Sequence, residues 1–226
     1  MTVKLTYYGH ATFAVEGGGA RLLIDPFLTG NPSAPVSAGK VQAEYIVVTH
    51  AHSDHLGDAE AIARRTGAVI VANYEIASRM EALGARAHAL HIGGGFDFPF
   101  GRVQLTIAHH GSSFGDGSYG GSPAGVLLTI EGKTVYHAGD TGLFYDMKLI
   151  GERGIDVAIL PIGDNYTMGP EDALRAVKLI EPRVVVPMHY GTFDVIQKDP
   201  AAFCQKVSSE TASRCVILKP GESYTV

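Results

Sequence analysis

Apolar runs of strand length that show no polar alternation constrain the fold of this chain most strongly. Three of them are AEYIVVTH at 43–50, DVAILPIGD at 156–164 and RVVVPMHYG at 183–191. Strands with this pattern are buried on both faces. A strand that ends in an aspartate precedes two of the runs, as ARLLIDP at 20–26 and KTVYHAGDT at 133–141. Two sheets packed face to face with helices outside satisfy this pattern, which predicts an α/β chain forming a four-layer αββα sandwich.

Turn and capping residues place helices between these strands. Asp58 is positioned to cap a helix that ends at Gly67, and Pro170 begins another helix. Helices are expected at 59–67, at 74–84, at 143–154, from 170 and from 200. Further strands are expected at 3–9, 11–17, 68–73, 96–101, 102–110, 125–132, 215–221 and 222–226.

The length of 226 residues allows one domain to bury most of its apolar surface. The second half repeats the order of the first, in which a strand ending in aspartate precedes a fully apolar strand. We therefore expect a single domain over 1–226, made of two pseudo-repeated halves at about 1–105 and 106–226.

Composition excludes several classes of protein. The 18 basic and 23 acidic side chains give a net charge of −5, and no basic cluster exceeds Arg64-Arg65, so nucleic acid is an unlikely partner. No apolar run reaches the roughly 18 residues of a membrane span, and the N-terminus lacks the apolar core of a signal peptide. A cytoplasmic protein without membrane contact is expected. Cys204 and Cys215 are too few for a disulfide scaffold and are interpreted as small buried hydrophobes.

The loop VTHAHSDHLGD at 48–58 is the strongest sign of chemistry. His50 and His52 alternate, so in an extended segment both side chains point to the same side. Asp54 and His55 come after the chain has turned, so one loop can direct two ligands to each of two metals. The HxHxDH pattern arises by chance in about one such chain in a thousand, which disfavours an ordinary solvated turn.

Further ligands are expected at the ends of other apolar strands. The candidates are His110 in TIAHHGSS, Asp140 in YHAGDTG and His189 in VVVPMHYGT. Taken singly, His110 or His189 is equally well explained as a structural histidine. Together with the first loop they favour metal ligation.

These motifs resemble the metallo-β-lactamase superfamily over the whole length of the chain. More narrowly, the chain is similar to an uncharacterised branch of metal-dependent hydrolases that resembles the L-ascorbate 6-phosphate lactonases. The resemblance rests on HAHSDH and on GHATF, IDPFLTGNP, VYHAGDTGLF, LPIGDNYTMGPEDA and VVVPMHYGTF. It implies a sandwich of the metallo-β-lactamase type with two mixed β-sheets flanked by helices.

The same resemblance implies a ligand set for two metals. One metal would be held by His50, His52 and His110, the second by Asp54, His55 and His189, with Asp140 bridging them. Imidazole suits zinc, manganese, iron or nickel, and a bridging carboxylate offsets the repulsion between two cations. Two divalent metal ions per chain are expected, with zinc favoured and manganese, nickel or iron as alternatives.

The chain departs from the resembled pattern at His109 and His110, where two adjacent histidines replace an apolar residue and a single histidine. Strand alternation sends them to opposite faces, so only one is a ligand. His110 is preferred because the following GSS matches the family spacing. His109 is then an exposed neighbour or a residue that supports a ligand.

Other residues are candidates for supporting a ligand or contacting substrate. The GH step at His10 resembles that of the lactonase-like branch, which suggests a histidine near the metals that binds substrate or moves a proton; a structural role in a turn is the alternative. Asp25 either orients a metal-bound histidine or caps a strand end. His88, His91 and His137 favour structural roles, although His91 is also able to approach the pocket. Loop residues that are placed to contact substrate are Ser112 in 111–125, and Asn165, Tyr166 and Thr167 in 163–170.

The Gly- and Ser-rich segment 111–125 is expected to be a mobile loop whose amides either cradle an anion or make no contact with ligand. The loop at 26–35 is interpreted in the same way.

The expected function is that of a binuclear metal-dependent hydrolase. A metal-bridging hydroxide would attack a small anionic ester, lactone or phosphodiester, with Asp54 and Asp140 holding the metals and His10 assisting proton transfer. Two alternatives remain at this stage. One is a nuclease-type phosphodiesterase, and the other is a non-catalytic metal-binding or sensory protein. A homo-oligomer is compatible with the sequence.

Overall fold

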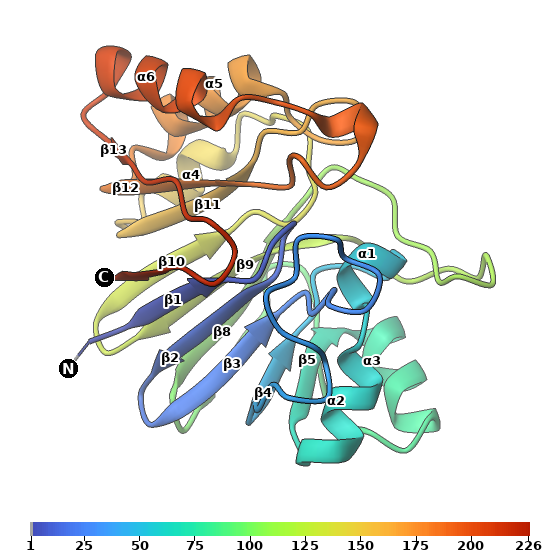
Figure 1. Ribbon diagram of the computed structural model, residues 1–226. Coiled ribbons are helices and arrows are strands. Elements are labelled where there is room, and N and C mark those ends of the chain that lie inside the picture. The colour runs from blue at the N-terminus through green and yellow to red at the C-terminus, as the bar shows by residue number, and fades with distance from the viewer. Residues whose placement is uncertain (1) are drawn as a thin grey trace.

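The computed structural model describes residues 2–226 as two seven-stranded sheets with helices on their outer faces (Figure 1). The first sheet has the order β14-β1-β2-β3-β4-β5-β6, and the second has the order β13-β12-β11-β10-β9-β8-β7. The strands of the first sheet are β1 Lys4–Tyr7, β2 Phe13–Gly17, β3 Ala20–Ile24, β4 Tyr45–Val47, β5 Val69–Asn73, β6 Arg86–Leu90 and β14 Ser223–Thr225. Those of the second are β7 Gly95–Phe98, β8 Gly101–Ile107, β9 Ala124–Ile130, β10 Lys133–His137, β11 Val157–Pro161, β12 Val184–Met188 and β13 Arg214–Cys215.

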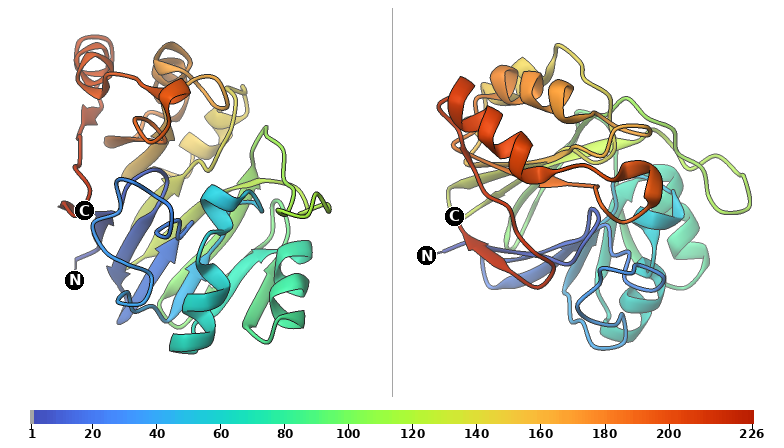
Figure 2. Two further views of the ribbon diagram at one scale, coloured as in Figure 1. Left: turned by 45° about the vertical axis from the view of Figure 1, so that its right-hand side comes forward. Right: turned by 45° about the horizontal axis from the view of Figure 1, so that its top comes forward.

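Helices cover the outer face of each sheet, which confirms the predicted αββα sandwich (Figure 2). α2 Ala59–Thr66 and α3 Tyr74–Ala82 pack on the first sheet, and α4 Met147–Gly151, α5 Pro170–Ile180 and α6 Pro200–Glu210 pack on the second. A short helix α1, Ser53–Leu56, and a 3₁₀ turn η1, Asp194–Ile196, lie in loops. The largest core cluster fills the space between the sheets.

Each sheet is mixed, as predicted. β14, β1, β2 and β3 pair antiparallel, whereas β3 through β6 pair parallel. The second sheet repeats this order, with β7 through β10 antiparallel and β10 through β13 parallel. The carboxyl ends of the parallel strands in each sheet therefore lie at one edge, where loops are free to carry function.

The chain passes from one sheet to the other between β6 and β7. The predicted boundary near residue 105 falls inside β8, and both β7 and β8 belong to the second sheet. The last strand, β14, returns to the first sheet and pairs with β1 in the register Leu5↔Tyr224. A return of this kind depends on tertiary contacts and leaves no local sequence signal.

Several helix ends follow local chemistry. Gly67 adopts the left-handed conformation at φ 77° that ends α2, and Asp199 caps α6 by accepting a hydrogen bond from the Ala201 N–H. Asp58 precedes α2 as predicted, but its carboxylate does not cap the helix. It accepts instead from the N–H groups of Leu28 and Thr29, and so anchors the loop that follows β3.

Cys204 and Cys215 form a disulfide that ties α6 to β13, with Cα atoms 5.1 Å apart. The prediction that they are separate buried hydrophobes was therefore wrong. Both residues are half-buried rather than enclosed in the core. The pairing depends on how α6 docks beside the edge strand, which a count of two cysteines does not reveal.

Among residues 2–226, no helix is both long enough and apolar enough to cross a membrane.

Candidate metal centre

Six of the ten histidines converge with two aspartates where loops leave the carboxyl ends of the parallel strands. They form three overlapping groups. Within each group, the candidate ligand atoms, one nitrogen or oxygen from each residue, all lie within 4.8 Å of one another. The first group is His50 with His52 and His110, the second is His10 with Asp54, His55 and His189, and a third, His50 with His55 and Asp140, overlaps both. All seven metal ligands expected from the resemblance are brought together, and His10 joins them.

The first group is a tripod of imidazole rings. His50 Nε2 lies 3.0 Å from His52 Nδ1. The ring of His110 stands nearly perpendicular to both, with centroids 5.1 Å from each. Three rings at right angles to one another direct their nitrogens toward one point, which is the arrangement of a three-histidine metal site.

The second group is assembled from α1 and the end of β12. Asp54 Oδ2 lies 3.9 Å from His55 Nε2 and 4.0 Å from His189 Nε2. The rings of His55 and His189 are stacked, with centroids 5.5 Å apart and an angle of 17°. One carboxylate oxygen and two imidazole nitrogens thus face a shared space.

Asp140 lies between the two groups. Its Oδ2 atom is 3.5 Å from His110 Nε2 in the first group, and 3.2 Å and 3.0 Å from His55 Nε2 and His189 Nε2 in the second. Ligands held about 2.0–2.1 Å from a tetrahedral zinc lie about 3.3 Å apart, so this spacing fits donors to metal. Among residues 2–226, Asp140 is the one carboxylate within 3.5 Å of ring nitrogens in both groups.

Unpaired buried atoms in the cluster also fit a metal. Among residues 2–226, five buried side-chain nitrogen or oxygen atoms lack a hydrogen-bond partner, and four of them belong to His55, Asp140 and His189. His55 Nε2 and His189 Nε2 lie 3.2 Å and 3.0 Å from the other carboxylate oxygen, Asp140 Oδ2, but without hydrogen-bond geometry. Each buried polar atom left unpaired costs about 1–3 kcal/mol. A cation bound beside Asp140 would satisfy both Nε2 atoms, whereas His189 Nδ1 lies on the other side of its ring.

Supporting residues fix which nitrogen each histidine presents. Asp25 Oδ2 accepts from His55 Nδ1 at 2.7 Å and from the Thr49 hydroxyl at 2.6 Å. His55 therefore carries its proton on Nδ1 and presents the Nε2 lone pair to the cluster. Because the Thr49 hydroxyl donates to Asp25, its oxygen accepts from His50 Nδ1 at 3.0 Å. His50 likewise presents Nε2, so Asp25 orients candidate ligands in both groups.

Electrostatics in the cluster favour a positive charge between the imidazoles. Burial lowers the pKa of His55, but the charges of Asp140 and Asp25 outweigh burial and hold that pKa well above its usual value. Burial raises the pKa of Asp140, and His55 and His189 outweigh it, so this carboxyl has a pKa well below its usual range. The charged carboxylate beside His55 is the partner that a divalent cation requires.

His10 is bonded to Asp54 and does not line the pocket. Its ring is fully buried, with Nε2 3.1 Å from Asp54 Oδ2 and Nδ1 3.0 Å from Thr192 Oγ1. Burial lowers the pKa of His10 to about 4, so the ring is neutral near pH 7. A carboxylate only accepts, so His10 Nε2–H donates to Asp54 and Nδ1 accepts from Thr192. The structure thus places His10 behind a candidate ligand, and we expect it to act as a positioning residue.

Three residues of the centre adopt left-handed backbone conformations that non-glycine residues rarely take. The φ angles are 58° for His10, 47° for Asp25 and 56° for His189. Conformations of this kind cost about 1–3 kcal/mol each and cluster at functional sites. The His189 N–H donates to the His10 carbonyl at 2.8 Å, which joins the end of β12 to the turn after β1. These turns direct both side chains inward.

A pocket of about 590 Å³ opens over the cluster. Candidate ligands line it together with apolar or aromatic side chains. Its lining residues are Phe27, His52, Ser53, Asp54, His110, Asp140, Tyr166, His189, Phe193 and Val195. None of them is lysine or arginine, and the pocket is open to solvent through the exposed Tyr166 and Val195.

His109 and His110 separate as strand alternation predicts. His110 lines the pocket, whereas His109 is exposed and its ring packs 5.1 Å from that of Phe144. The backbone N–H of His109 donates to the Thr141 hydroxyl, next to Asp140. His109 therefore contributes to the frame of the site through its backbone, and His110 through its side chain.

The other candidates differ in whether they reach the site. Ser112 Oγ accepts from the Ala51 N–H at 3.2 Å, so it steadies the segment between His50 and His52. Tyr166 lines the pocket, whereas Asn165 and Thr167 do not. His91 is exposed and turned onto the Ile92 N–H, outside the cluster.

The segment 111–125 does not line the pocket. It extends past α3 (Figure 2), where Arg79 pairs with Asp116 at 2.7 Å and the Asn73 amide donates to the carbonyls of Gly120 and Ser122. The segment begins beside His52, and its absence from the pocket lining favours the predicted alternative of a loop without contact to ligand. Its glycines serve the close approach to neighbouring elements, since a Cβ at Gly121 would collide with Asn73.

His137 has the structural role predicted for it. It is fully buried, its Nε2 donates to the Ala11 carbonyl at 2.9 Å, and its Nδ1 accepts from the Gly139 N–H. Both ring nitrogens are satisfied, which leaves none for a metal. His88, also expected to be structural, packs against Phe96 and Phe98.

Sequence reasoning missed three apolar residues of the pocket and two threonines. Phe27, Phe193 and Val195 line the pocket, and Thr49 and Thr192 bind ring nitrogens of candidate site residues. One usable signal was present, because Phe193 and Val195 are apolar residues in a loop only a few positions after His189. Thr192 gave none, since its partner His10 is distant in the sequence.

The two adjacent histidines provide a matched pair for testing the first group. We expect His110→Ala to weaken metal binding about tenfold, because it removes one leg of the tripod, and His109→Ala to leave binding unchanged. Zinc titration with a chelating indicator, followed by elemental analysis, measures both. Equal losses in the two variants would contradict the assignment.

The chain is similar to known proteins over its whole length. A family model described as the β-lactamase superfamily domain matches residues 4–189, a span that includes every residue of the three groups. A UPF0173 metal-dependent hydrolase of Heliobacterium modesticaldum is 52% identical over 233 residues, covering 99% of this chain and 98% of the relative.

Solved structures agree with the sequence relatives. Igni18, a metallo hydrolase from the hyperthermophilic archaeon Ignicoccus hospitalis, has a TM-score of 0.92 at 44% identity, covering 100% of this chain and 99% of its own. An isothiocyanate hydrolase from Delia radicum gut bacteria shares the fold, with a TM-score of 0.77 at 23% identity and 98% of each chain covered.

Proposed function

This chain belongs to the β-lactamase superfamily and is a metal-dependent hydrolase, and from that premise we propose that it is a binuclear enzyme for small ester, lactone or phosphodiester substrates. The position of Asp140 carries the proposal. Its Oδ2 atom lies 3.0–3.5 Å from three imidazole nitrogens that belong to two different groups. A carboxylate in this position is suited to bridging two cations.

Zinc is the proposed metal, with manganese, nickel or iron as alternatives. The first group offers three imidazoles, and the second adds a carboxylate, Asp54, to two imidazoles. Histidine-rich sets with carboxylates suit all four ions, and zinc is the most common of them in hydrolytic sites. Bound divalent ions would supply Lewis acidity and a hydroxide nucleophile at neutral pH.

The residues of the chain hold the reacting groups in place. Asp54 and Asp140 contribute two negative charges, which offset half the charge of two divalent ions and leave the centre electropositive. An ester carbonyl or a phosphodiester would therefore be drawn into the pocket by its reacting group. Asp25 holds His55, and through Thr49 also His50, in the tautomers that expose Nε2. Preorganised ligands of this kind need no rearrangement during reaction.

The pocket disfavours both alternative functions. Its lining has no lysine or arginine and the net charge is −5, so nucleic acid would find no cationic path to the centre. A purely structural metal site is normally closed, whereas here the candidate ligands border a pocket of about 590 Å³. A lactone like that of the resembled lactonases remains among the proposed substrates, although the lining offers its phosphate no cationic side chain.

Metal content and turnover together test the proposal. The protein is stripped with a chelator, reloaded with zinc, manganese or nickel, and assayed on bis-p-nitrophenyl phosphate, p-nitrophenyl esters and a panel of lactones. We expect two equivalents of metal and hydrolysis that the stripped protein lacks. One equivalent at saturation would refute the binuclear site, and full loading without turnover on any substrate would refute the proposed reaction.

A variant of His10 separates positioning from catalysis. His10→Gln is expected to retain much of the activity, because an amide N–H is able to donate to Asp54 as the ring does, whereas His10→Ala is expected to lower kcat about tenfold with KM little changed. Metal content should remain near two in both. Steady-state kinetics with elemental analysis provide the comparison, and equal losses of kcat in the two variants would argue against support through a hydrogen bond.

A further inference from the structure

The pocket beside the candidate ligands exposes large apolar side chains. Val195 is 55% exposed, Tyr166 57% and Phe193 37%, and Phe27 lines the same pocket. We call Phe27, Tyr166, Phe193 and Val195 the apolar wall. Apolar surface gathered at a pocket, rather than scattered singly, marks a place where a ligand is buried.

The loop after β12 presents part of this wall in a fixed position. Ile196 is fully buried and anchors the loop, while Phe193 and Val195 remain exposed on either side of Asp194. The Gly191 N–H donates to the Ile196 carbonyl, and the Gln197 amide donates to the carbonyls of Gly191 and Phe193. A loop closed by these bonds holds its exposed side chains in place before any ligand arrives.

The apolar wall is continuous with the metal centre. The ring centroids of Phe193 and Phe27 are 6.5 Å apart. The ring centroid of His10 lies 5.4 Å from that of Phe193 and 5.6 Å from that of Phe27. His10 in turn bonds Asp54. A substrate whose reacting group lies at the metal centre, beside Asp54 and Asp140, therefore places its adjacent substituent against Phe27 and Phe193.

Charge around the pocket excludes an anionic group at the apolar wall. No lysine or arginine lines the pocket, and Lys198, in the loop that follows η1, is bound to Asp164 at 2.9 Å. The charged residues that do line it, besides histidines, are Asp54 and Asp140. A phosphate or carboxylate on the substituent would lose water without gaining a charged partner.

We propose that the pocket selects substrates whose scissile group carries an uncharged apolar substituent of about the size of an aromatic ring, seated on Phe27, Phe193 and Val195. This inference rests on the proposed function and narrows its substrate class. Negative charge, where the substrate has any, lies on the reacting group beside the metals. Phosphorylated sugar lactones are disfavoured as substrates.

Binding of unreactive ligands tests the inference independently of turnover. The chain contains no tryptophan, so Tyr166→Trp introduces a single fluorescent reporter at the pocket. Zinc-loaded protein is titrated with benzylphosphonate and with 2-carboxyethylphosphonate, which share a metal-binding head and differ in the remote group. We expect benzylphosphonate to bind at least about tenfold more tightly, as burial of an aromatic ring predicts. Equal affinities, a preference for the carboxylate or binding of neither ligand would overturn the proposal.

Variants of the apolar wall locate the selectivity. In the Tyr166→Trp background, Val195→Ser and Phe193→Ser should each reduce the preference for benzylphosphonate severalfold. Val195→Lys should improve binding of the carboxylate ligand, because it supplies the missing cation. Val195 is 55% exposed, so its substitution is compatible with folding. Unchanged selectivity in all three would refute the assignment to this wall.

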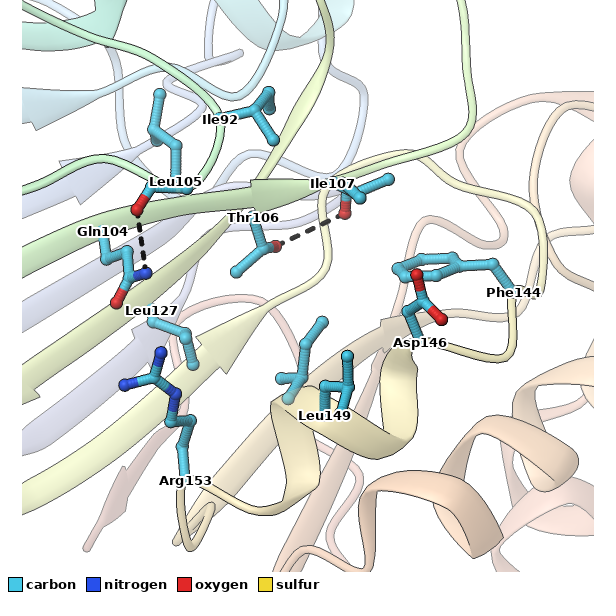
Figure 3. A pocket seen from close by; sticks show the side chains of 12 residues that line it. Ile92, Gln104, Leu105, Thr106, Ile107, Leu127, Phe144, Asp146, Leu149 and Arg153 are labelled. Carbon is cyan, nitrogen blue, oxygen red and sulfur yellow. Dashed lines mark hydrogen bonds between the residues drawn. The ribbon is translucent and has the colours of Figure 1, made fainter.

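A second hollow provides the control. It lies on the outer face of the second sheet between β8, β9 and α4, has a volume of about 220 Å³ and is also mainly apolar (Figure 3). Leu149, 58% exposed, forms part of its wall, so Leu149→Ser should leave both phosphonate affinities unchanged. Loss of benzylphosphonate binding in this variant would place the ligand in the outer hollow and overturn the proposal.

Turnover distinguishes failure of the inference from failure of the proposed function. If p-nitrophenyl esters are hydrolysed but phosphonates bind without regard to the remote group, the reaction stands and the selectivity does not. If benzylphosphonate is preferred and no ester, lactone or phosphodiester is cleaved, the apolar pocket stands and the proposed reaction fails.

Discussion

Asp140→Ala is expected to lower metal content from two ions toward less than one and to reduce hydrolysis by more than about 100-fold. Loss of a residue that only supports a metal ligand typically costs 10–100-fold, and Asp140 is itself a candidate ligand that approaches nitrogens of both groups. The variant also removes the negative charge that offsets repulsion between two cations. Elemental analysis and steady-state kinetics on zinc-loaded protein measure the two losses.

The control for this experiment is Asp146→Ala. Asp146 is exposed beside the outer hollow, makes no side-chain cap to α4 and lies outside the cluster, so its loss should affect neither metal nor rate. Retention of two metals and of normal turnover by Asp140→Ala would show that the bridging assignment is incorrect. Retention of one metal with no turnover would still support a role for both sites.

Asp25→Asn is expected to weaken metal binding by about 10–100-fold although Asp25 contacts no metal in the proposed scheme. The carboxylate now accepts from both His55 Nδ1–H and the Thr49 hydroxyl. An amide nitrogen placed toward His55 would donate instead, so His55 would shift its proton to Nε2 and lose its ligand lone pair. The replaced acceptor also leaves a buried donor unpaired, which costs about 1–3 kcal/mol of folding stability.

Isothermal titration of stripped protein with zinc measures the affinity, and thermal unfolding without metal measures the stability. Asp58→Asn is the matched control, because this aspartate anchors the loop after β3 without touching a histidine, and an asparagine oxygen can still accept there. Equal zinc affinity in Asp25→Asn and the wild type would contradict the tautomer argument. NMR of the imidazole nitrogens would report directly which one carries the proton.

The pH dependence of zinc affinity follows from the same contacts. Asp140 and Asp25 hold the pKa of His55 above its usual value in the metal-free chain, despite the opposing effect of burial. Below that raised pKa a proton occupies the nitrogen that the metal needs. Affinity should therefore rise with pH until His55 is neutral, which the titration detects when repeated across the range.

The sequence alone indicated the layers of the fold and the residues of the cluster because both depend on local patterns. Unalternating apolar runs such as 156–164 identify strands that are buried on both faces, and histidines just beyond them fall at the edge where such strands end. The choice of His110 over His109 followed from spacing, and the structure places their side chains accordingly.

Other features depend on segments that meet only in the folded chain. Thr192 is hydrogen-bonded to His10, and the ring of Phe193 lies near that of Phe27. Both pairs are too far apart in the sequence for a periodic pattern to reveal them. The Cys204–Cys215 disulfide likewise needs α6 to dock beside β13. Asp58 does precede α2, as the capping rule predicts, but its carboxylate accepts hydrogen bonds from two N–H groups of the loop after β3 instead of capping the helix.

The unpaired atoms of His55, Asp140 and His189 link the lifetime of this protein to metal supply. Each unpaired atom costs the metal-free fold about 1–3 kcal/mol, and a bound ion both removes that cost at the atoms it contacts and adds its own binding free energy to stability. A cell short of metal would hold more of the chain in opened states that proteases cleave. The amount of this protein in the cell would then fall together with its activity, so both quantities would report metal starvation.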